Sequence, residues 1–289
     1  MFRRIALTGA LLVIAFLAGV AVFLTAKGVP AFGAEAGEQL YGKDSLVGLV
    51  GPLLFGTVLA SVIAMVVVAP LAIGLALVIS HYAPRRLARP VGFLVDLLAA
   101  VPSVIVGLWG IEVLAPRVAP LLESLDRLPF LEGPVPSSGR TLLTAALVLA
   151  LMALPIVTAI MREVFAQTPR AHEEAALALG ATRWEMVRMA VLPYGRSGIV
   201  AALMLGLGRA LGETMAVAMV LGATGAKLSA DLIAADGANT IAAFIANNYA
   251  NASGVKTNVL VFAGLALFVL TFAVNYLGRW VASRGRVAV

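Results

Sequence analysis

Two charged residues lie inside an otherwise apolar stretch of the chain, GLGRALGETMAVAMVLG at residues 206–222. Arg209 falls near the middle of an apolar run long enough to cross a bilayer, where insertion scales assign an arginine a cost of about 2.5–3.5 kcal/mol. Its guanidinium presents a fixed fork of hydrogen-bond donors, a geometry that matches tetrahedral oxyanions. The residue type and its position therefore predict an anion-binding site inside a membrane.

Glu213 follows Arg209 by four residues, which places both charges on one face of a continuous helix and lets them pair. The pair offsets part of the cost of the arginine, and it is also compatible with a buried ion pair that only fixes helix packing. Gly208 and Gly212, likewise four residues apart, predict a face where another helix can approach closely. Of the two interpretations, we favour the one in which Arg209 and Glu213 line a substrate path.

The elements that must position these residues are membrane-spanning helices. Apolar residues make up 61% of the 289 residues and charged residues 12%, with a mean hydropathy of +1.01, which is outside the range of soluble globular domains. The composition and run lengths predict an all-α polytopic membrane protein with six transmembrane helices. The six apolar runs lie at residues 5–26, 49–80, 91–115, 140–166, 196–222 and 258–281. Pro70, Pro102 and Pro155 inside these runs are interpreted as kinks.

Lysine and arginine are distributed unequally between alternate loops. Thirteen of them lie in segments on the same side as the N-terminus, and seven lie in the longer segments on the other side. Because an excess of basic residues marks the cytoplasmic side, we predict that both termini are cytoplasmic. The net charge of +6 is then a consequence of topology and does not indicate nucleic-acid binding.

The longest predicted cytoplasmic loop, residues 167–198, carries the signals of two short helices. Thr-Pro at 168–169 predicts a capped helix start, and Gly180 predicts a left-handed stop. Thr-Arg-Trp-Glu at 182–185 has the spacing of a capping box for a second helix that runs to Pro193. Such a compact element suits the docking of a soluble partner, and an amphipathic hairpin on lipid headgroups is the alternative.

The same loop contains a recognisable motif. Glu174-Ala175-Ala176, then Gly180, then Leu192-Pro193 resemble the EAA loop of the binding-protein-dependent ABC importer permeases, and every spacing agrees. Ala190 stands where that family usually has isoleucine. The resemblance implies the type I ABC importer permease (MetI-like) fold. It also implies that the loop, at about residues 167–195, is a coupling helix seated in a cleft of an ATP-binding subunit.

The segment around Arg209 resembles a narrower group. GRALGETMAVAMVLG is similar to the corresponding helix of the phosphate-specific importer permeases of the PstC type, as are GANTIAAFIANNYA at 237–250 and ALFVLTFAVN in the last run. The resemblance implies an inner-membrane complex with a PstA-like second permease subunit, a PstB-like ATPase dimer and a PstS-like phosphate-binding protein. It further implies that Arg209 and Glu213 line the path of inorganic phosphate.

These expectations divide the chain into two parts and leave alternatives open. Residues 1–48 are expected to form an N-terminal transmembrane helix and the first outer loop, and residues 49–289 the permease domain. A permease for sulfate, molybdate or phosphonate remains an alternative, as do a secondary anion transporter and a non-transporting scaffold. Asp96 and Glu112, in the third apolar run, are expected to be solvated or interfacial.

No catalytic residue is assigned to this chain. It has no cysteine, and we expect no metal site at its two histidines. No phosphate loop of the form G-x-x-x-x-G-K-[ST] occurs in the sequence. We therefore expect that the chain binds no cofactor itself and that a partner ATPase uses ATP and Mg²⁺.

Overall fold

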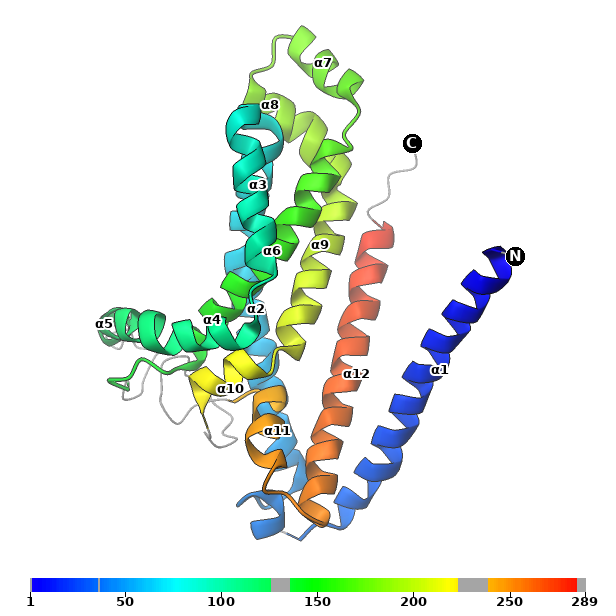
Figure 1. Cartoon of the computed structure of the whole chain (residues 1–289), viewed down its shortest axis with the longest axis vertical. Helices are drawn as coiled ribbons and strands as arrows, with labels where there is room; N and C mark the ends of the chain where they lie inside the picture. The colour runs from blue at the N-terminus through cyan, green and yellow to red at the C-terminus, as the bar shows by residue number, and fades with distance from the viewer. Residues whose placement is uncertain (1, 36, 126–135, 223–238, 285–289) are drawn as a thin grey trace.

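The structure is a computed structural model whose elements are helices (Figure 1). It describes residues 2–35, 37–125, 136–222 and 239–284. Within these ranges, six helical segments are long and apolar enough to cross a membrane. They are Arg3–Gly33, Leu46–Tyr82, Ser103–Ser124, Leu142–Ala166, Arg183–Gly212 and Val255–Trp280. The prediction of an all-helical polytopic protein is confirmed.

Three π-helical turns, in which each hydrogen bond spans five residues, interrupt or extend the α-helices. One follows α2, one lies between α4 and α5, and one lies between α8 and α9. The α-helices are α1 (Phe2–Gly28), α2 (Leu46–Leu77), α3 (Arg85–Ala99), α4 (Ser103–Trp109), α5 (Ala115–Leu125), α6 (Leu142–Ala166), α7 (Arg170–Ala178), α8 (Arg183–Met186), α9 (Leu192–Gly212), α10 (Met215–Leu221), α11 (Ile241–Tyr249) and α12 (Val255–Arg284). The π turns are η3 (Val78–Tyr82), η4 (Gly110–Leu114) and η5 (Val187–Val191), and short 3₁₀ helices occupy η1 (Val29–Gly33) and η2 (Glu38–Leu40).

The core is a column made by α2, α6 and α9. One face of α2 carries a small or β-branched residue at every fourth position, and all five are fully buried: Ala60, Ala64, Val68, Ala72 and Ala76. Positions four apart lie above one another on a helix, so this face is narrow and smooth. In lipid, close packing of such faces holds helices together, because the surrounding tails are as apolar as the side chains.

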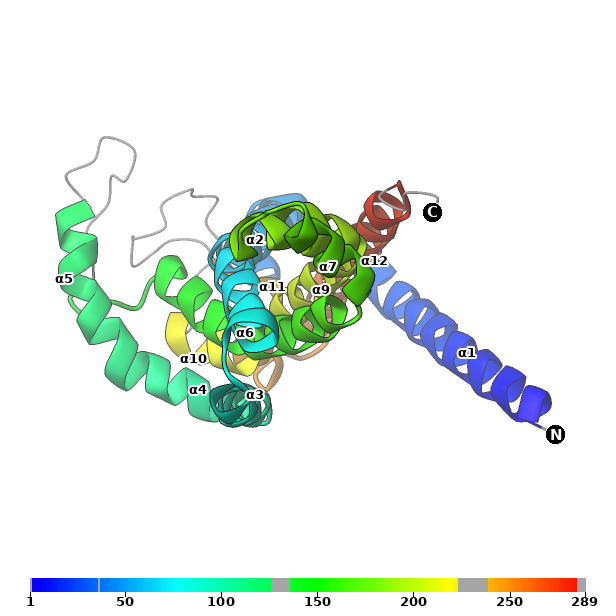
Figure 2. The ribbon, with the colours of Figure 1, turned by 90° about the horizontal axis from the view of Figure 1, so that it is seen from above.

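The remaining helices are arranged around this column (Figure 1). α7 and α8 lie at one end of it, the α7 end, and α11 lies toward the other, the α11 end. α4 and α5 run across the column, whereas α1 and α12 meet at the α11 end and diverge toward the α7 end. Figure 2 shows that α5 and α1 extend away from the column on opposite sides.

Two of the six predicted runs contain a break where none was expected. The run at 91–115 was interpreted as one helix with a kink at Pro102, but it is divided between α3 and α4. The run at 196–222 is likewise divided between α9 and α10. Pro70 and Pro155, in contrast, lie inside the continuous helices α2 and α6.

Candidate functional site

The break between α9 and α10 is formed by Glu213 and Thr214. α9 ends at Gly212, and Glu213 has an extended backbone conformation with φ −68° and ψ 125°. The Glu213 carboxylate then accepts a hydrogen bond from the backbone N–H of Ala216 (Oε1···N 3.3 Å). This N–H is one of the donors that the first turn of α10 leaves without a helical partner. Glu213 therefore caps α10.

The predicted pairing of Arg209 with Glu213 is wrong. It assumed one continuous helix, and the helix ends between the two residues, at Gly212. The ion pairs of the described residues do not include these two side chains. Arg209 is exposed on this chain, and Glu213 is directed to the backbone of α10.

A second break lies beside the first. Pro102 has no N–H and disfavours a helical conformation at Val101, so α3 stops and α4 starts again after the proline. α4 and α10 then cross in close contact, because a Cβ on Gly107 would lie 2.9 Å from the Cα of Ala216. The two breaks thus occupy one region of the molecule.

Arg209 lines a cavity at this region. The other lining residues are apolar and come from the end of α3, the break, α4 and α6: Leu98, Ala99, Val101, Val106, Leu151 and Met152. Non-helical backbone at membrane depth is tolerated where it lines a cavity or is buried in protein. The breaks therefore create a space in which one guanidinium faces apolar walls.

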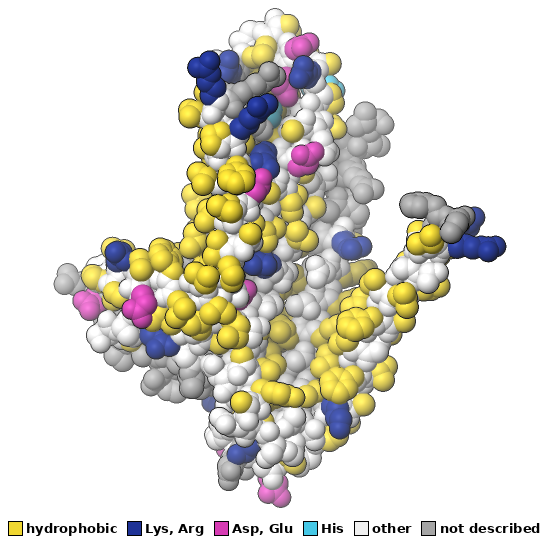
Figure 3. Space-filling model, viewed as in Figure 1, with side chains coloured by type: hydrophobic (Ala, Val, Ile, Leu, Met, Phe, Trp, Pro, Cys, Tyr) yellow, Lys and Arg dark blue, Asp and Glu magenta, His cyan; other side chains and the backbone are white. Residues whose placement is uncertain are grey.

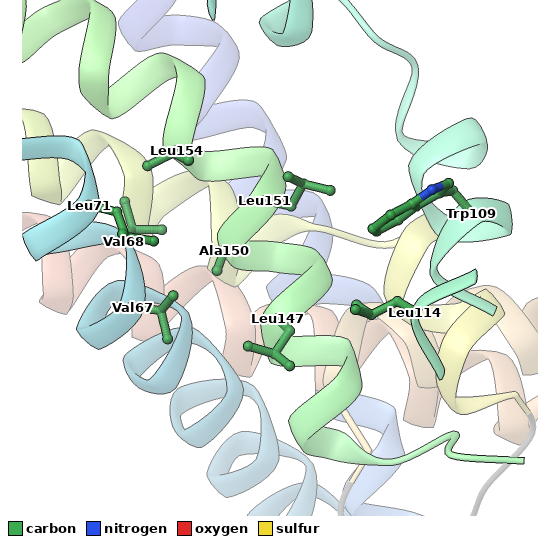
Figure 4. A pocket seen from close by; sticks show the side chains of 9 residues that line it. All are labelled: Val67, Val68, Leu71, Trp109, Leu114, Leu147, Ala150, Leu151 and Leu154. Carbon is green, nitrogen blue, oxygen red and sulfur yellow. The ribbon is translucent and has the colours of Figure 1, made fainter. Parts of the chain in front are cut away.

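A larger cavity nearby has almost entirely apolar walls, and the indole N–H of Trp109 is the one side-chain donor among its lining residues (Figure 4). It lies between α2, α6 and the α4–α5 segment, and aliphatic side chains line it together with the ring of Trp109. Leu151 lines both this cavity and the one at Arg209. Because an anion needs hydrogen-bond donors in a low-dielectric site, we place the candidate site at Arg209.

Arg140 holds the far end of α10, and the sequence did not single it out. Its Nε donates to the carbonyl of Val220 at 2.9 Å and its Nη2 to the carbonyl of Met219 at 2.6 Å. Asn247 donates to the carbonyl of Gly222, the residue after α10, at 2.6 Å. A cation at a helix C-terminus is favourable, but nothing in the local sequence links Arg140 to a helix some eighty residues later.

The prediction for the glycines of α9 is not met inside this chain. A Cβ on Gly208 or Gly212 would have nothing within 4 Å, so no helix in the described part of this chain packs there. Gly206 is the glycine that meets a neighbour, because a Cβ on it would overlap the side chain of Val157 in α6. The side of α9 that carries Gly208 and Gly212 is therefore open in the single chain.

The loop at the α7 end has the predicted two-helix form. Gly180 has φ +83° and ends the first helix, as expected of a residue with no Cβ. Thr182 and Glu185 form a complete capping box for α8. Of the EAA residues, Glu174 and Ala175 are exposed and Ala176 is buried.

Two details of that loop differ from prediction. The hydroxyl of Thr168 is buried and makes no hydrogen bond, so it does not cap α7, whose N-cap position is Pro169. The second helix does not stop at Pro193, because α8 continues through η5 into α9. The wider π turn lies where the proline ring would otherwise clash with the carbonyl four residues earlier.

A contact between side chains ties α7 to the end of α2. His81 Nε2 lies 3.3 Å from Oε1 of Glu173, and His81 Nδ1 lies 2.6 Å from the hydroxyl of Ser80. The side chains of His81 and Glu173 are 9% and 24% exposed, so the contact is partly shielded from solvent. His81 lies in η3, which continues the end of α2. Movement of α7 would therefore reach α2 directly.

Asp96 and Glu112 differ in their surroundings. Glu112 is exposed in η4, in agreement with the expectation that it is solvated or interfacial. Asp96 is half-exposed but also forms an ion pair with Arg162 of α6, which the sequence did not indicate.

The chain matches known proteins over most of its length. A model of the family described as "Binding-protein-dependent transport system inner membrane component" matches residues 69–287. The chain is 48% identical over 288 residues to the phosphate transport system permease protein PstC 2 of Mycobacterium tuberculosis, covering 95% of this chain and 88% of that protein. It is 41% identical to the phosphate transport system permease protein PstC of Mesorhizobium japonicum, covering 98% and 92%.

Solved structures share the fold at lower identity. An inward-facing MetNI methionine ABC transporter chain superposes with a TM-score of 0.56 at 21% identity, covering 84% of this chain and 96% of that one. A chain of a bacterial ABC transporter that imports alginate superposes with a TM-score of 0.59 at 19% identity, covering 81% and 78%. These likenesses bear on the fold alone.

Proposed function

The chain belongs to the family of binding-protein-dependent transport system inner membrane components, and we propose on that basis that it is the permease subunit of an ATP-driven importer of inorganic phosphate. The observation that carries the proposal is the 48% identity, over nearly the whole chain, to a phosphate transport system permease. As an ABC permease subunit, the chain supplies the membrane path, and catalysis belongs to another subunit.

The proposed complex has four kinds of subunit. A PstA-like permease pairs with this chain, a PstB-like dimer hydrolyses ATP with Mg²⁺, and a PstS-like protein delivers phosphate from outside. The open side of α9 at Gly208 and Gly212 supports a second permease as a neighbour, because small-residue faces on membrane helices are usually covered by another helix.

Orientation follows from the same proposal. We place α7, α8 and both termini in the cytoplasm and α11 on the outer side, in a multi-pass bacterial inner-membrane protein. The excess of basic residues in the segments on the α7 side supports this orientation.

Coupling begins at α7, where Glu174, Ala175 and Ala176 of the EAA motif would meet the ATPase. Closure of the ATPase moves α7, and the contact of Glu173 with His81 passes that movement to α2. A second route runs through Gly180 and α8 into η5 and then, past Leu192 and Pro193, into α9, whose last turn carries Arg209.

Arg209 is the residue that we assign to the anion. A phosphate entering a low-dielectric path loses its hydration, and a guanidinium replaces part of it with charge-assisted hydrogen bonds. Glu213 acts indirectly, because it fixes the start of α10 beside the cavity. Its single negative charge also limits how strongly the region attracts an anion, which must leave again.

The test is uptake of labelled phosphate by the reconstituted four-part complex in sealed vesicles. We expect uptake that needs ATP, persists when ionophores collapse the ion gradients, and is not inhibited by sulfate or molybdate in tenfold excess. Uptake driven by an ion gradient without ATP would instead make the chain a secondary transporter. Strong competition by sulfate or molybdate would assign it to another oxyanion.

A further inference from the structure

An ion pair joins α3 to α6 on the α7 side of Arg209. The Nη2 of Arg162 lies 3.3 Å from Oδ2 and 3.4 Å from Oδ1 of Asp96. Both distances exceed the ~2.7–2.9 Å usual for charge-assisted hydrogen bonds. One guanidinium nitrogen contacts both carboxylate oxygens, whereas a bidentate pair would use two nitrogens. Asp96 thus neutralises Arg162 without using its full hydrogen-bonding capacity.

Arg162 keeps donors that no residue of the described chain uses. Asp96 is its one hydrogen-bond partner in that part of the protein, and the contact occupies Nη2. The guanidinium lies against the backbone of α3 at Gly92, where a Cβ would overlap Nη1. The pair is also open to its surroundings, because the side chains of Arg162 and Asp96 are 30% and 50% exposed.

The two helices that carry the pair also line the cavity at Arg209, which itself lies on α9. α3 contributes Leu98 to the Arg209 cavity and α6 contributes Met152. Asp96 precedes Leu98 by half a turn, and Arg162 lies ten residues beyond Met152, about 15 Å of helix rise toward the α7 end. On the face of the column turned toward the viewer in Figure 3, basic and acidic side chains follow one another from the α7 end toward α4.

A path with one deep cation would hold an anion too well. Conduction requires sites that bind weakly enough to release their ion, which is achieved by several sites in sequence. A carboxylate that neutralises a cation while the path is empty also lowers the cost of keeping an arginine at membrane depth. An arriving phosphate can replace that carboxylate on the guanidinium, exchanging one anion for another.

We infer that Arg162 is a second anion-binding position, reached after Arg209 on the way to the α7 end, and that Asp96 is its exchangeable counterion. The inference rests on the proposed function, because it takes phosphate as the anion that moves along this face. In the empty path, Asp96 occupies Arg162. During transport, phosphate takes the place of Asp96 on the guanidinium and is then released at the α7 end.

Labelling with phenylglyoxal, which reacts with accessible guanidinium groups, tests this inference on the assembled complex. We expect inorganic phosphate to slow labelling of Arg162, as measured by mass spectrometry, and sulfate to slow it less. Asp96→Asn should raise the labelling rate severalfold and make the protection by phosphate larger. Arg86, an exposed arginine of α3, serves as the internal control, and phosphate should leave its labelling unchanged.

The outcomes separate this inference from the proposed function. Protection of Arg162 that persists in the Arg209→Gln variant supports a separate second site. If ATP drives phosphate uptake but phosphate protects Arg162 in neither the native protein nor Asp96→Asn, the pair only joins α3 to α6 and the inference is overturned. If the complex takes up no phosphate at all, the proposed function itself fails.

Discussion

Arg209 and Glu213 lie four residues apart but face different partners. The arginine faces a cavity with apolar walls, and the glutamate accepts a hydrogen bond from the first turn of α10. Their roles are therefore separable by substitution, since one acts through charge and the other mainly through backbone geometry.

Substitution of Arg209 tests the role of its charge. Arg209→Gln should lower the initial rate of ATP-driven phosphate uptake by about tenfold to a hundredfold, because hydrogen bonds to charged groups contribute about 1.5–3 kcal/mol. The uptake rate of Arg209→Lys should lie between those of the native protein and Arg209→Gln, because lysine keeps the charge but loses the fork of donors. Size-exclusion chromatography should show unchanged assembly. Normal uptake by Arg209→Gln would remove Arg209 from the path, and lost assembly would favour a packing role.

For Glu213, the two informative variants differ in whether they retain an acceptor. Glu213→Gln keeps an oxygen for the N–H of Ala216, whereas Glu213→Ala leaves that donor without it, at a cost of about 0.5–2 kcal/mol. We expect the thermal midpoint of the purified complex to fall for alanine and to stay near the native value for glutamine. Equal losses in the two variants would show that the charge, and not the cap, stabilises this region.

Among the elements, α4 and α10 cross with their backbones in close contact. Gly107→Ala places a Cβ 2.9 Å from the Cα of Ala216, and a backbone atom cannot move aside as a flexible side chain can. We expect a destabilisation of about 1–3 kcal/mol, the usual cost of overpacking, seen as a lower thermal midpoint and slower uptake.

The matched control for that variant is Gly74→Ala in α2, where a Cβ would have nothing within 4 Å. Replacing a glycine inside a helix by alanine is favourable by about 0.5–1 kcal/mol when there is room for the methyl group. This control should therefore equal or exceed the native thermal midpoint. If the two variants behaved alike, the close approach of α4 and α10 would be in doubt.

The sequence predicted some elements well because their signals are local. Thr182 and Glu185 specify a capping box within four residues, and Gly180 specifies a left-handed stop by itself. The breaks in the third and fifth runs were missed because hydropathy sums over a window and does not register which backbone bonds are lost. Pro70 and Pro102 look alike in sequence, yet one lies within a helix and the other begins a new one.

The candidate site was predicted in part. Arg209 stood out because a charge in an apolar run is unusual. Arg140 and the Asp96–Arg162 pair did not, since their partners are remote in sequence and only the packing of α3, α6 and α10 brings them together. Spacing rules predict which residues share one face of a helix, but they do not predict which residues of two different helices come into contact.

At the scale of the whole molecule, orientation is directly testable because the chain has no cysteine. Leu179, 89% exposed beside α7, and Ser253, exposed at the α11 end, can each be replaced by the single cysteine of a variant. In intact cells that lack the partner ATPase, a membrane-impermeant maleimide should label Ser253→Cys. Leu179→Cys should react only after permeabilisation. The reverse pattern would invert the proposed topology.

The π turn η5 sets the direction in which Arg209 faces. A turn closed by i→i+5 hydrogen bonds holds one residue more than an α-helical turn. If Val187–Val191 formed an α-helical turn with no residue deleted, every residue after it would be rotated by about 100° around the axis. The rotation would turn the guanidinium away from the cavity with its neighbours otherwise unchanged. The single additional residue in η5 therefore fixes the rotation of α9 about its axis. It does so some twenty residues before Arg209, the side chain whose direction it determines.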